Sequence, residues 1–302
     1  MSQENPTNVS ASVRQKLLNK ARSEKRPFGE LLQYYAMERF LYRLSQSVHS
    51  DRYILKGALM LRVWQAPEIR PTMDIDMLGK TSNDELSIVS QMKDVLSVDI
   101  KSDGLLFDLA SIQYENITED ADYHGARIKF KCLLDTAKIN MQIDIGFGDI
   151  VYPEPTRESF PTILNDPSAL LYCYSKESTI AEKFEAMIKL GELNSRMKDF
   201  YDIWLLSRKF IFKGEALSKA IELTFEKRQT ALPNKIELFT QAFVDDKQIQ
   251  WQAFIKKLNL KQTPDVFAEI VEGICIFLDP VVLAVTNNVT LSKTWSVSGR
   301  WK

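Results

Sequence analysis

Histidine is scarce in this chain of 302 residues, and the two that it has, His49 and His124, show no spacing typical of a zinc site or a Ser–His system. The sequence also contains no P-loop, no nucleophile elbow and no dinucleotide-binding glycine pattern. Gly146-Phe147-Gly148 lacks the third glycine and the following helix, so it indicates a turn after a strand. We therefore do not expect histidine-based catalysis or a common nucleotide-binding loop.

Cysteine is also sparse, and long apolar runs are absent. Cys132, Cys173 and Cys275 lie far apart, without metal-ligand spacing, and fit a reducing compartment as small buried side chains. The start of the chain has no charged-then-apolar leader. The most apolar stretch, residues 270–285, is interrupted by two carboxylates and a proline, so it is too short and polar to cross a bilayer. We expect a cytoplasmic protein that is not bound to a membrane.

Charge of one sign is not in excess either. The net charge of −1 argues against a uniformly basic nucleic-acid-binding protein, although it leaves room for a local basic patch. With 45% hydrophobic and 26% charged residues, the composition is that of a folded globular protein. A length of 302 residues is enough for one large domain or two ordinary ones.

The most informative feature that is present is a pair of carboxylates one residue apart. Asp74 and Asp76 fall in an apolar segment that predicts a strand, so their side chains share a face. A second predicted strand, residues 139–145, alternates apolar and polar residues and places Asp144 on its polar face. If the strands are neighbours, the three acids converge on Mg²⁺ or Mn²⁺ shared with substrate phosphates. The alternative is a solvated strand face that binds no ion.

The pattern along the chain predicts an α+β fold, with N-terminal helices and a small mixed β-sheet followed by a helical domain. Ser12 is a candidate helix N-cap, and Pro27 opens a second helix. We expect the sheet strands near Asp74 and at 53–55, 105–114, 126–133 and 139–145. Residues 286–302 give no clear signal. The expected divisions are N-terminal helices at 1–50, the core at 51–150, a proline-rich linker at 151–166 and a helical domain at 167–302.

Two helices of the last domain carry further candidates. Lys183 borders the apolar stripe of its helix, where a lysine suits the charge of a triphosphate. Asp199 and Asp202 share one face of the next helix. Ordinary roles remain open for these residues. Lys183 is equally compatible with an amine whose stem covers apolar surface, and Lys198 with Asp202 is compatible with a simple i,i+4 ion pair.

Taken in order, these segments resemble the AbiEii family. Its members are nucleotidyltransferase toxins of type IV toxin–antitoxin and phage-defence (abortive infection) systems, related to the MenT toxins and to the polymerase-β-like superfamily. The resemblance covers roughly residues 30–285. The segments that carry it are Leu55-Lys56-Gly57-Ala58-Leu59, Arg70-x-Thr72-x-Asp74-Ile75-Asp76, residues 143–149, residues 180–184, and Arg196-x-Lys198-Asp199-Phe200-Tyr201-Asp202.

This resemblance implies roles for individual residues. Asp74 and Asp76 would be catalytic and hold the metal, with Asp144 as a third ligand, and Lys183 and Asp199 would be the catalytic residues of the helical domain. The superfamily usually has Gly-Gly or Gly-Ser where this chain has Gly57-Ala58, which leaves phosphate contact to backbone N–H groups. The nucleotide-binding set implied is Gly57, Ala58, Arg70, Thr72, Lys183 and Asp202.

The implied reaction transfers a nucleoside monophosphate from an NTP to an acceptor hydroxyl, with Mg²⁺ or Mn²⁺ as cofactor and a cognate antitoxin as protein partner. Relatives that modify tRNA ends make RNA the leading acceptor. One local feature agrees with an RNA acceptor, because basic residues cluster on the first predicted helix and could follow a phosphate backbone. A solvated helix face explains the same cluster. Its candidate RNA-binding residues are Arg14, Lys16, Lys20 and Arg22.

Two other classes of function stay open. One is a different Asp-x-Asp metal enzyme, such as a nucleotide-sugar glycosyltransferase, which would not need Lys183 or Asp199. The other is a catalytically silent scaffold that binds a partner or nucleic acid. The joint presence of Asp74, Asp76 and Lys183 argues against the scaffold.

Overall fold

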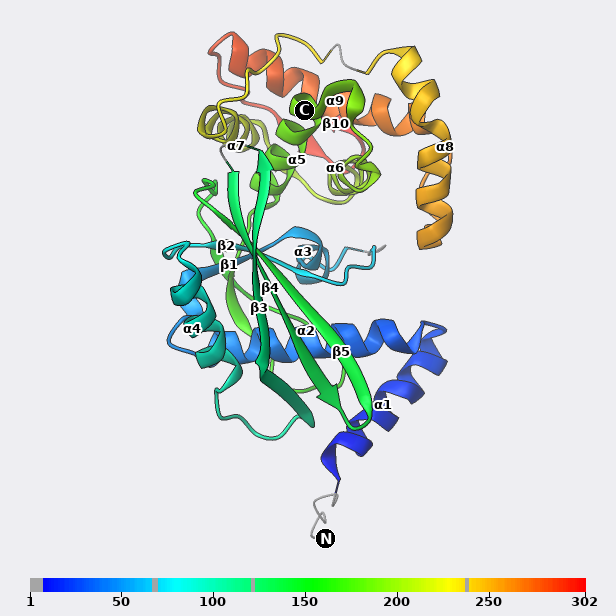
Figure 1. Ribbon diagram of the computed structural model, residues 1–302. Coiled ribbons are helices and arrows are strands. Elements are labelled where there is room, and N and C mark those ends of the chain that lie inside the picture. The colour runs from blue at the N-terminus through cyan, green and yellow to red at the C-terminus, as the bar shows by residue number, and fades with distance from the viewer. Residues whose placement is uncertain (1–7, 67–69, 121–122, 237–238) are drawn as a thin grey trace. The chain divides into compact units, whose positions relative to one another are not determined.

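The computed structural model of the protein describes residues 8–66, 70–120, 123–236 and 239–302. The chain forms two compact units, and each is described separately below. The sheet unit comprises the described residues of Met1–Gln65, Pro71–Gly148 and Thr156–Cys173. The helical unit comprises those of Ala66–Arg70, Asp149–Pro155 and Tyr174–Lys302. Figure 1 shows the elements of both units.

A seven-stranded mixed sheet organises the sheet unit, with strand order β3-β4-β5-β2-β1-β7-β6. β2 runs parallel to β5 and β1 parallel to β7, whereas the other neighbours are antiparallel, so the predicted α+β class with a mixed sheet is confirmed. β6 lies in the proline-rich stretch, where the pattern predicted no strand. The strands are β1 (Tyr53–Lys56), β2 (Ile75–Gly79), β3 (Leu105–Asp120), β4 (Tyr123–Leu134), β5 (Ala137–Phe147), β6 (Thr156–Ser159) and β7 (Leu170–Cys173).

The two faces of this sheet differ in polarity. Ile75 and Met77 of β2 and Ile143 of β5 are fully buried on one face, while Asp76 of β2 and the polar residues of β5, Asn140, Gln142 and Asp144, lie on the other face. α2 (Phe28–Gln46) packs against β5, and Figure 1 shows it lying across the strands; α4 (Glu85–Leu96) packs against α2 and β3. The polar face is therefore the one on which a functional site can form.

Shorter helices complete the sheet unit. The first helix, α1 (Val9–Glu24), begins before Ser12, which was the wrong N-cap. The Asn8 side chain accepts the Ala11 N–H at 3.0 Å and caps the helix instead. α2 begins directly after Pro27, as expected. The remaining helical segments are η1 (Ser50–Arg52), η2 (Gly57–Leu59) and α3 (Met60–Val63).

Helices dominate the second unit, and a small sheet of order β10-β9-β8 accompanies them. One partly buried cation ties residues 149–155 to the helices of this unit: Arg228 donates to Asp149 at 3.0 and 3.1 Å and to Glu185 at 2.9 Å. No helix among the described residues is long and apolar enough to span a membrane. The elements are α5 (Lys176–Leu190), η3 (Gly191–Leu193), α6 (Met197–Lys209), β8 (Phe212–Lys213), α7 (Gly214–Lys227), α8 (Gln241–Leu258), α9 (Phe267–Thr286), β9 (Thr294–Ser296) and β10 (Arg300–Trp301).

The end of the chain, which gave no sequence signal, is part of the core of the helical unit. Trp295 on β9 is 1% exposed, and its indole N–H donates to the carbonyl of Ser207 on α6 at 2.6 Å. Its ring lies 4.7 Å from that of Phe277 on α9 and 5.4 Å from that of Trp301 on β10. The β9–β10 hairpin therefore fastens α6 to α9.

We expect Trp295→Ala to destabilise the full chain by about 3–5 kcal/mol, because it leaves a cavity and an unsatisfied carbonyl in the core. Urea denaturation measured by circular dichroism tests this. Val297→Ala is the matched control, since Val297 follows β9 but is 53% exposed, and should change stability by less than about 0.5 kcal/mol. Equal stability of the two variants would contradict a core role for the hairpin.

Candidate active site

Three carboxylates meet on the polar face of the sheet, as the sequence predicted they would if the two strands were neighbours. Asp76 of β2 lies directly opposite Asp144 of the parallel strand β5, and Asp74 immediately precedes β2. Each is partly buried and offers a carboxylate oxygen, and these oxygens all lie within 4.8 Å of one another. This is the carboxylate cluster of the sheet unit.

Helix α2 fixes the position of Asp74 from the other side of the sheet. The Gln33 side chain donates to the carbonyls of Met73 and Asn140, both at 3.1 Å, and so joins the Asp74 segment to β5. The backbone N–H of Thr72 donates to the Tyr34 hydroxyl at 3.2 Å, and the Thr72 hydroxyl donates to the Asp74 carboxylate. The predicted residue Thr72 therefore orients Asp74 through a hydrogen bond.

Gly57 lies against Asp76 at the end of β1. Lys56 is the cross-strand neighbour of Asp76, and Gly57 follows it with φ +71°, in the left-handed region that favours glycine. A Cβ atom at this position would lie 1.9 Å from Asp76 Oδ2, so any side chain would displace the carboxylate. Ala58 follows in the η2 turn and is buried at 4% exposure.

Arg127 was missed by the sequence reasoning. It lies opposite Asp144 across the β4–β5 pair and donates to both of its carboxylate oxygens, at 2.8 and 2.7 Å. The Gln142 side chain also donates to both, at 3.2 Å. These hydrogen bonds to Asp144 raise the pKa of Arg127. The alternation within residues 126–133 was the available signal, because it placed Arg127 on the polar face of its strand.

The carboxylate cluster has the chemistry of a site for a hard divalent cation. Carboxylate oxygens are the ligands that Mg²⁺ and Mn²⁺ prefer, and three negative charges so close together repel one another unless a cation is present. Arg127 offsets the charge of Asp144 and occupies its oxygens, so Asp144 is less available to a metal ion. The residues present therefore fit a metal ion of this type.

In the helical unit, Lys183 lies at the centre of a buried ion-pair network. Its ammonium group is 2.7 Å from Asp199 Oδ1 and 2.9 Å from Asp202 Oδ2. Arg70 donates to both oxygens of Asp202 at 2.8 Å, and Arg196 Nε lies 2.8 Å from Asp199 Oδ2. In these ion pairs of the described residues, three cations thus face two carboxylates.

These ion pairs determine the protonation states of the network. Burial works to lower the pKa of Lys183, but the Asp199 and Asp202 carboxylates outweigh it and raise this pKa above its usual value. Burial likewise works to raise the pKa of Asp202, while Arg70 and Lys183 outweigh it and lower this pKa to about 2. Lys183 is therefore a fixed cation at neutral pH, suited to electrostatic stabilisation rather than proton transfer.

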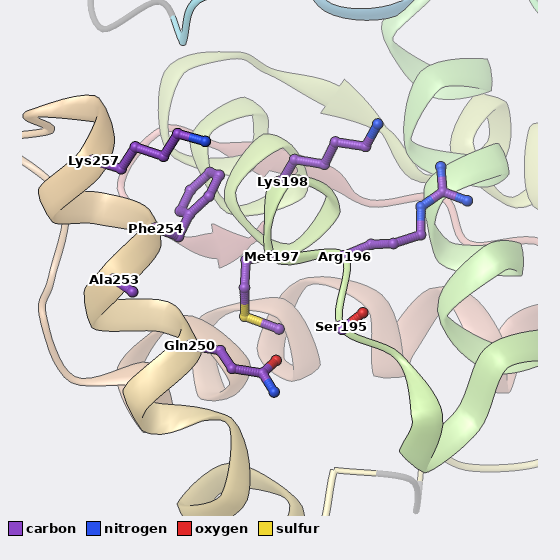
Figure 2. Close-up of a pocket in the computed structure, with 8 residues that line it drawn as sticks. All are labelled: Ser195, Arg196, Met197, Lys198, Gln250, Ala253, Phe254 and Lys257. Atoms are coloured by element: carbon purple, nitrogen blue, oxygen red, sulfur yellow. The ribbon is translucent and has the colours of Figure 1, made fainter.

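A basic hollow lies beside this network at the start of α6. Its volume is about 490 Å³, and Figure 2 shows side chains from α6 and α8 around it. Lys198 is exposed and lines this hollow, while Asp202 pairs with Arg70 and Lys183, so the simple Lys198–Asp202 pair does not form. The lining residues are Ser195, Arg196, Met197, Lys198, Gln250, Ala253, Phe254 and Lys257.

The basic cluster on α1 is partly neutralised within the sheet unit. Lys20 forms an ion pair with Glu24 at 2.9 Å, and the Arg14 guanidinium lies over the Phe28 ring at 5.7 Å. Lys16 and Arg22 remain exposed. The helix therefore offers less positive charge to a nucleic acid than its sequence suggests.

Residues 39–273 match the family described as nucleotidyl transferase AbiEii toxin, type IV TA system. The structure is similar to the crystal structure of JHP933 from Helicobacter pylori, with a TM-score of 0.50 at 14% identity over 86% of this chain and 95% of that one. A second H. pylori structure, described as a candidate nucleotidyltransferase, has a TM-score of 0.47 at 14% identity over the same shares. Among curated proteins, none matches this chain.

We expect Gly57→Ala to weaken Mn²⁺ binding at least about tenfold, because the new methyl group displaces the Asp76 carboxylate. Loss of the free six-line Mn²⁺ signal in electron paramagnetic resonance measures binding. Gly29→Ala on α2 is the matched control, because a Cβ atom added at Gly29 would have no neighbouring atom within 4 Å. Unchanged Mn²⁺ affinity in Gly57→Ala would show that Asp76 is not a ligand.

We expect Arg127→Gln to strengthen Mn²⁺ binding about tenfold, since it removes a cation that competes for the oxygens of Asp144. The same resonance assay applies. Lys129→Gln removes an equal charge from the same strand, but Lys129 pairs with Glu115 at 2.7 Å rather than with the cluster, so its effect should stay below about twofold. Equal effects of Arg127→Gln and Lys129→Gln would mean that Mn²⁺ affinity depends on the net charge of the strand and not on the pairing of Arg127 with Asp144.

Proposed function

Because this chain belongs to the AbiEii family of nucleotidyl transferase toxins from type IV toxin–antitoxin systems, we propose that it transfers a nucleoside monophosphate from an NTP to a hydroxyl group of RNA, with Mg²⁺ or Mn²⁺ as cofactor. Family membership makes it a nucleotidyltransferase with an NTP substrate and an antitoxin partner. The observation that carries the metal-dependent mechanism is the carboxylate cluster of Asp74, Asp76 and Asp144.

In this mechanism Asp74 and Asp76 hold the divalent cation, and Asp144 supports them while paired with Arg127. When bound, the cation neutralises charge on the triphosphate and lowers the pKa of the attacking hydroxyl. Thr72 keeps Asp74 oriented by its hydrogen bond. The tight turn at Gly57 presents backbone N–H groups to the triphosphate, which needs no hydroxyl from the residue that follows.

The transfer makes one bond and breaks one bond at the α-phosphorus. The acceptor oxygen attacks this phosphorus and loses its proton to solvent, and the bond to the bridging oxygen breaks, so that pyrophosphate leaves on the opposite side. Lys183 supplies positive charge to the nucleotide phosphates, and Asp199 and Asp202 hold its ammonium group in place. Arg70 supports Lys183 indirectly because it fixes Asp202 from the other side.

RNA, and in particular a tRNA end, is the acceptor that we propose. The basic hollow supports a polyanionic substrate, since it combines three cations with the aromatic ring of Phe254, and no carboxylate is among the described residues that line it. The exposed Lys16 and Arg22 on α1 add a weaker basic surface. Modification of host RNA would account for a toxin that acts in antiviral defence.

Incubation of the protein with each α-³²P-labelled NTP, Mg²⁺ and total RNA tests the proposal. We expect labelled RNA, and Asp74→Asn should reduce the label at least about 100-fold because it removes a metal ligand. Lys183→Met should also reduce it strongly. Lys219→Ala is the control, since this lysine of α7 is exposed and pairs with Glu222.

Folding must be checked for the buried lysine, because Lys183→Met leaves Asp199 and Asp202 with one cation fewer. Thermal melting followed by circular dichroism separates unfolding from loss of chemistry, and Lys183→Arg, which keeps the charge, should retain more activity than Lys183→Met. Label that persists in both Asp74→Asn and folded Lys183→Met would refute the site. Label transferred to protein or carbohydrate rather than RNA would refute the acceptor.

A further inference from the structure

A second hollow lies on the polar face of the sheet unit, beside the carboxylate cluster. Its volume is about 530 Å³, within the range of about 300–1,000 Å³ that is usual for small-molecule sites. Gln142 lines this hollow and also hydrogen-bonds to Asp144, so the two sites share a residue. The lining residues are Met73, Ser111, Gln113, Lys129, Phe130, Lys131, Asn140, Met141 and Gln142.

A bulge in β3 accounts for this sheet hollow. The pairing of β3 with β4 passes from Asp108 to Gln113 on β3 but only from Lys131 to Lys129 on β4, so β3 carries extra residues there. Within the bulge, the Ser111 hydroxyl accepts the backbone N–H of Lys131 at 2.8 Å. A side chain thus takes a hydrogen bond that a regular strand partner would otherwise make, and the sheet surface opens.

The lining of the sheet hollow has unused hydrogen-bonding groups. Lys131, Gln113 and Asn140 are exposed, and among the described residues none forms a hydrogen bond or ion pair with their side-chain polar atoms. Met73 is 58% exposed although it immediately precedes Asp74. Lys129 is less available because it pairs with Glu115 at 2.7 Å. The hollow therefore offers two free amides, one free ammonium group and one exposed thioether.

This combination suits a nucleoside with a single phosphate group. Carboxamides both donate and accept hydrogen bonds, which matches the edge of a nucleobase. A methionine side chain packs against the face of an aromatic ring. One free lysine suits one phosphodiester, whereas a triphosphate needs more positive charge than Lys131 supplies. The chemistry of the lining therefore favours one nucleotide of a nucleic-acid chain over the NTP.

The position of the sheet hollow relative to the carboxylate cluster indicates that a nucleotide bound there would be the acceptor. The strand order β3-β4-β5-β2-β1 places the carboxylate cluster, on β5 and β2, between the sheet hollow on one side and the Gly57 turn after β1 on the other. In an in-line displacement the attacking and leaving oxygens lie on opposite sides of the phosphorus. If the triphosphate lies at Gly57, the acceptor hydroxyl approaches from the side of the hollow.

We propose that the sheet hollow binds the terminal nucleoside of the RNA acceptor, with Gln113 and Asn140 reading the base edge, Met73 packing on the base and Lys131 holding the last phosphodiester. The inference rests on the proposed function, because it takes the acceptor to be RNA and the Gly57 turn to bind the triphosphate. It makes these four residues the determinants of which RNA end is modified.

The experiment uses four synthetic RNA 12-mers that are identical except for the 3′-terminal nucleotide, with the 302-residue protein, Mg²⁺ and the preferred labelled NTP. We expect the wild-type protein to prefer one 3′ end. Lys131→Ala should raise KM for that RNA about tenfold. Gln113→Ala with Asn140→Ala should bring the four 3′ ends to within about twofold of one another, whereas KM for the NTP should change by less than about twofold.

Lys93→Ala is the matched control for Lys131→Ala. Lys93 is also an exposed lysine, but it lies on α4, and the described residues that line the sheet hollow include none from α4. Its KM for RNA should be unchanged. If the wild-type protein labels RNA but the Lys131 and amide variants keep its KM and its 3′-end preference, the sheet hollow is not the acceptor site. If the wild-type protein labels no RNA, the proposed function itself fails. Thermal melting of each variant tests for unfolding. We expect none, because Lys131, Gln113 and Asn140 are exposed and should tolerate substitution.

Discussion

Charge compensation on the open face of one β-sheet is the constraint on which the candidate site depends. The parallel register of β2 and β5 places Asp76 directly beside Asp144. Asp74 immediately precedes β2, and its carboxylate lies close to the other two. Like charges at this spacing are unfavourable unless cations lie close by. Among the described residues, Arg127 on the next strand supplies one such cation, which pairs with Asp144. The cluster of three carboxylates on this face suits a divalent cation and the phosphates that accompany it.

In the helical unit the charge to be compensated is positive. Lys183 is a buried cation, and burial alone would favour its neutral form. Asp199 and Asp202 keep it charged, and Arg70 in turn keeps Asp202 ionised. Asp199 and Asp202 are both buried, so loss of Lys183, which pairs with both of them, weakens the compensation of two buried carboxylates, which is costly. The network fixes Lys183 in one position, as electrostatic catalysis requires of a group that offsets developing charge.

The sheet and helical units each carry a hollow next to their charged groups, and the two hollows differ in chemistry. The hollow in the helical unit combines cations with the Phe254 ring, a combination suited to the backbone and bases of a single strand. The sheet hollow is richer in amides and has one free lysine, so it is suited to discriminate among bases. For the RNA acceptor that we propose, these would be complementary needs, since one surface would supply affinity and the other would supply choice of acceptor.

The sequence by itself predicted the fold class, the shared face of Asp74 and Asp76, and the polar strand face that carries Asp144, whereas the pairing of β2 with β5 that joins them was decided by the tertiary structure. Residues 139–145 alternate between apolar and polar, and Asp74 and Asp76 are two residues apart. Both patterns show which side chains share a strand face, because that depends only on the geometry of one strand. The ordered motifs indicated the family as well. Tertiary structure decided the rest. Arg127 reaches Asp144, and Trp295 enters the core, only because strands and helices distant in sequence pack together. No periodicity of one segment contains that information, since partners are chosen by the packing of whole elements.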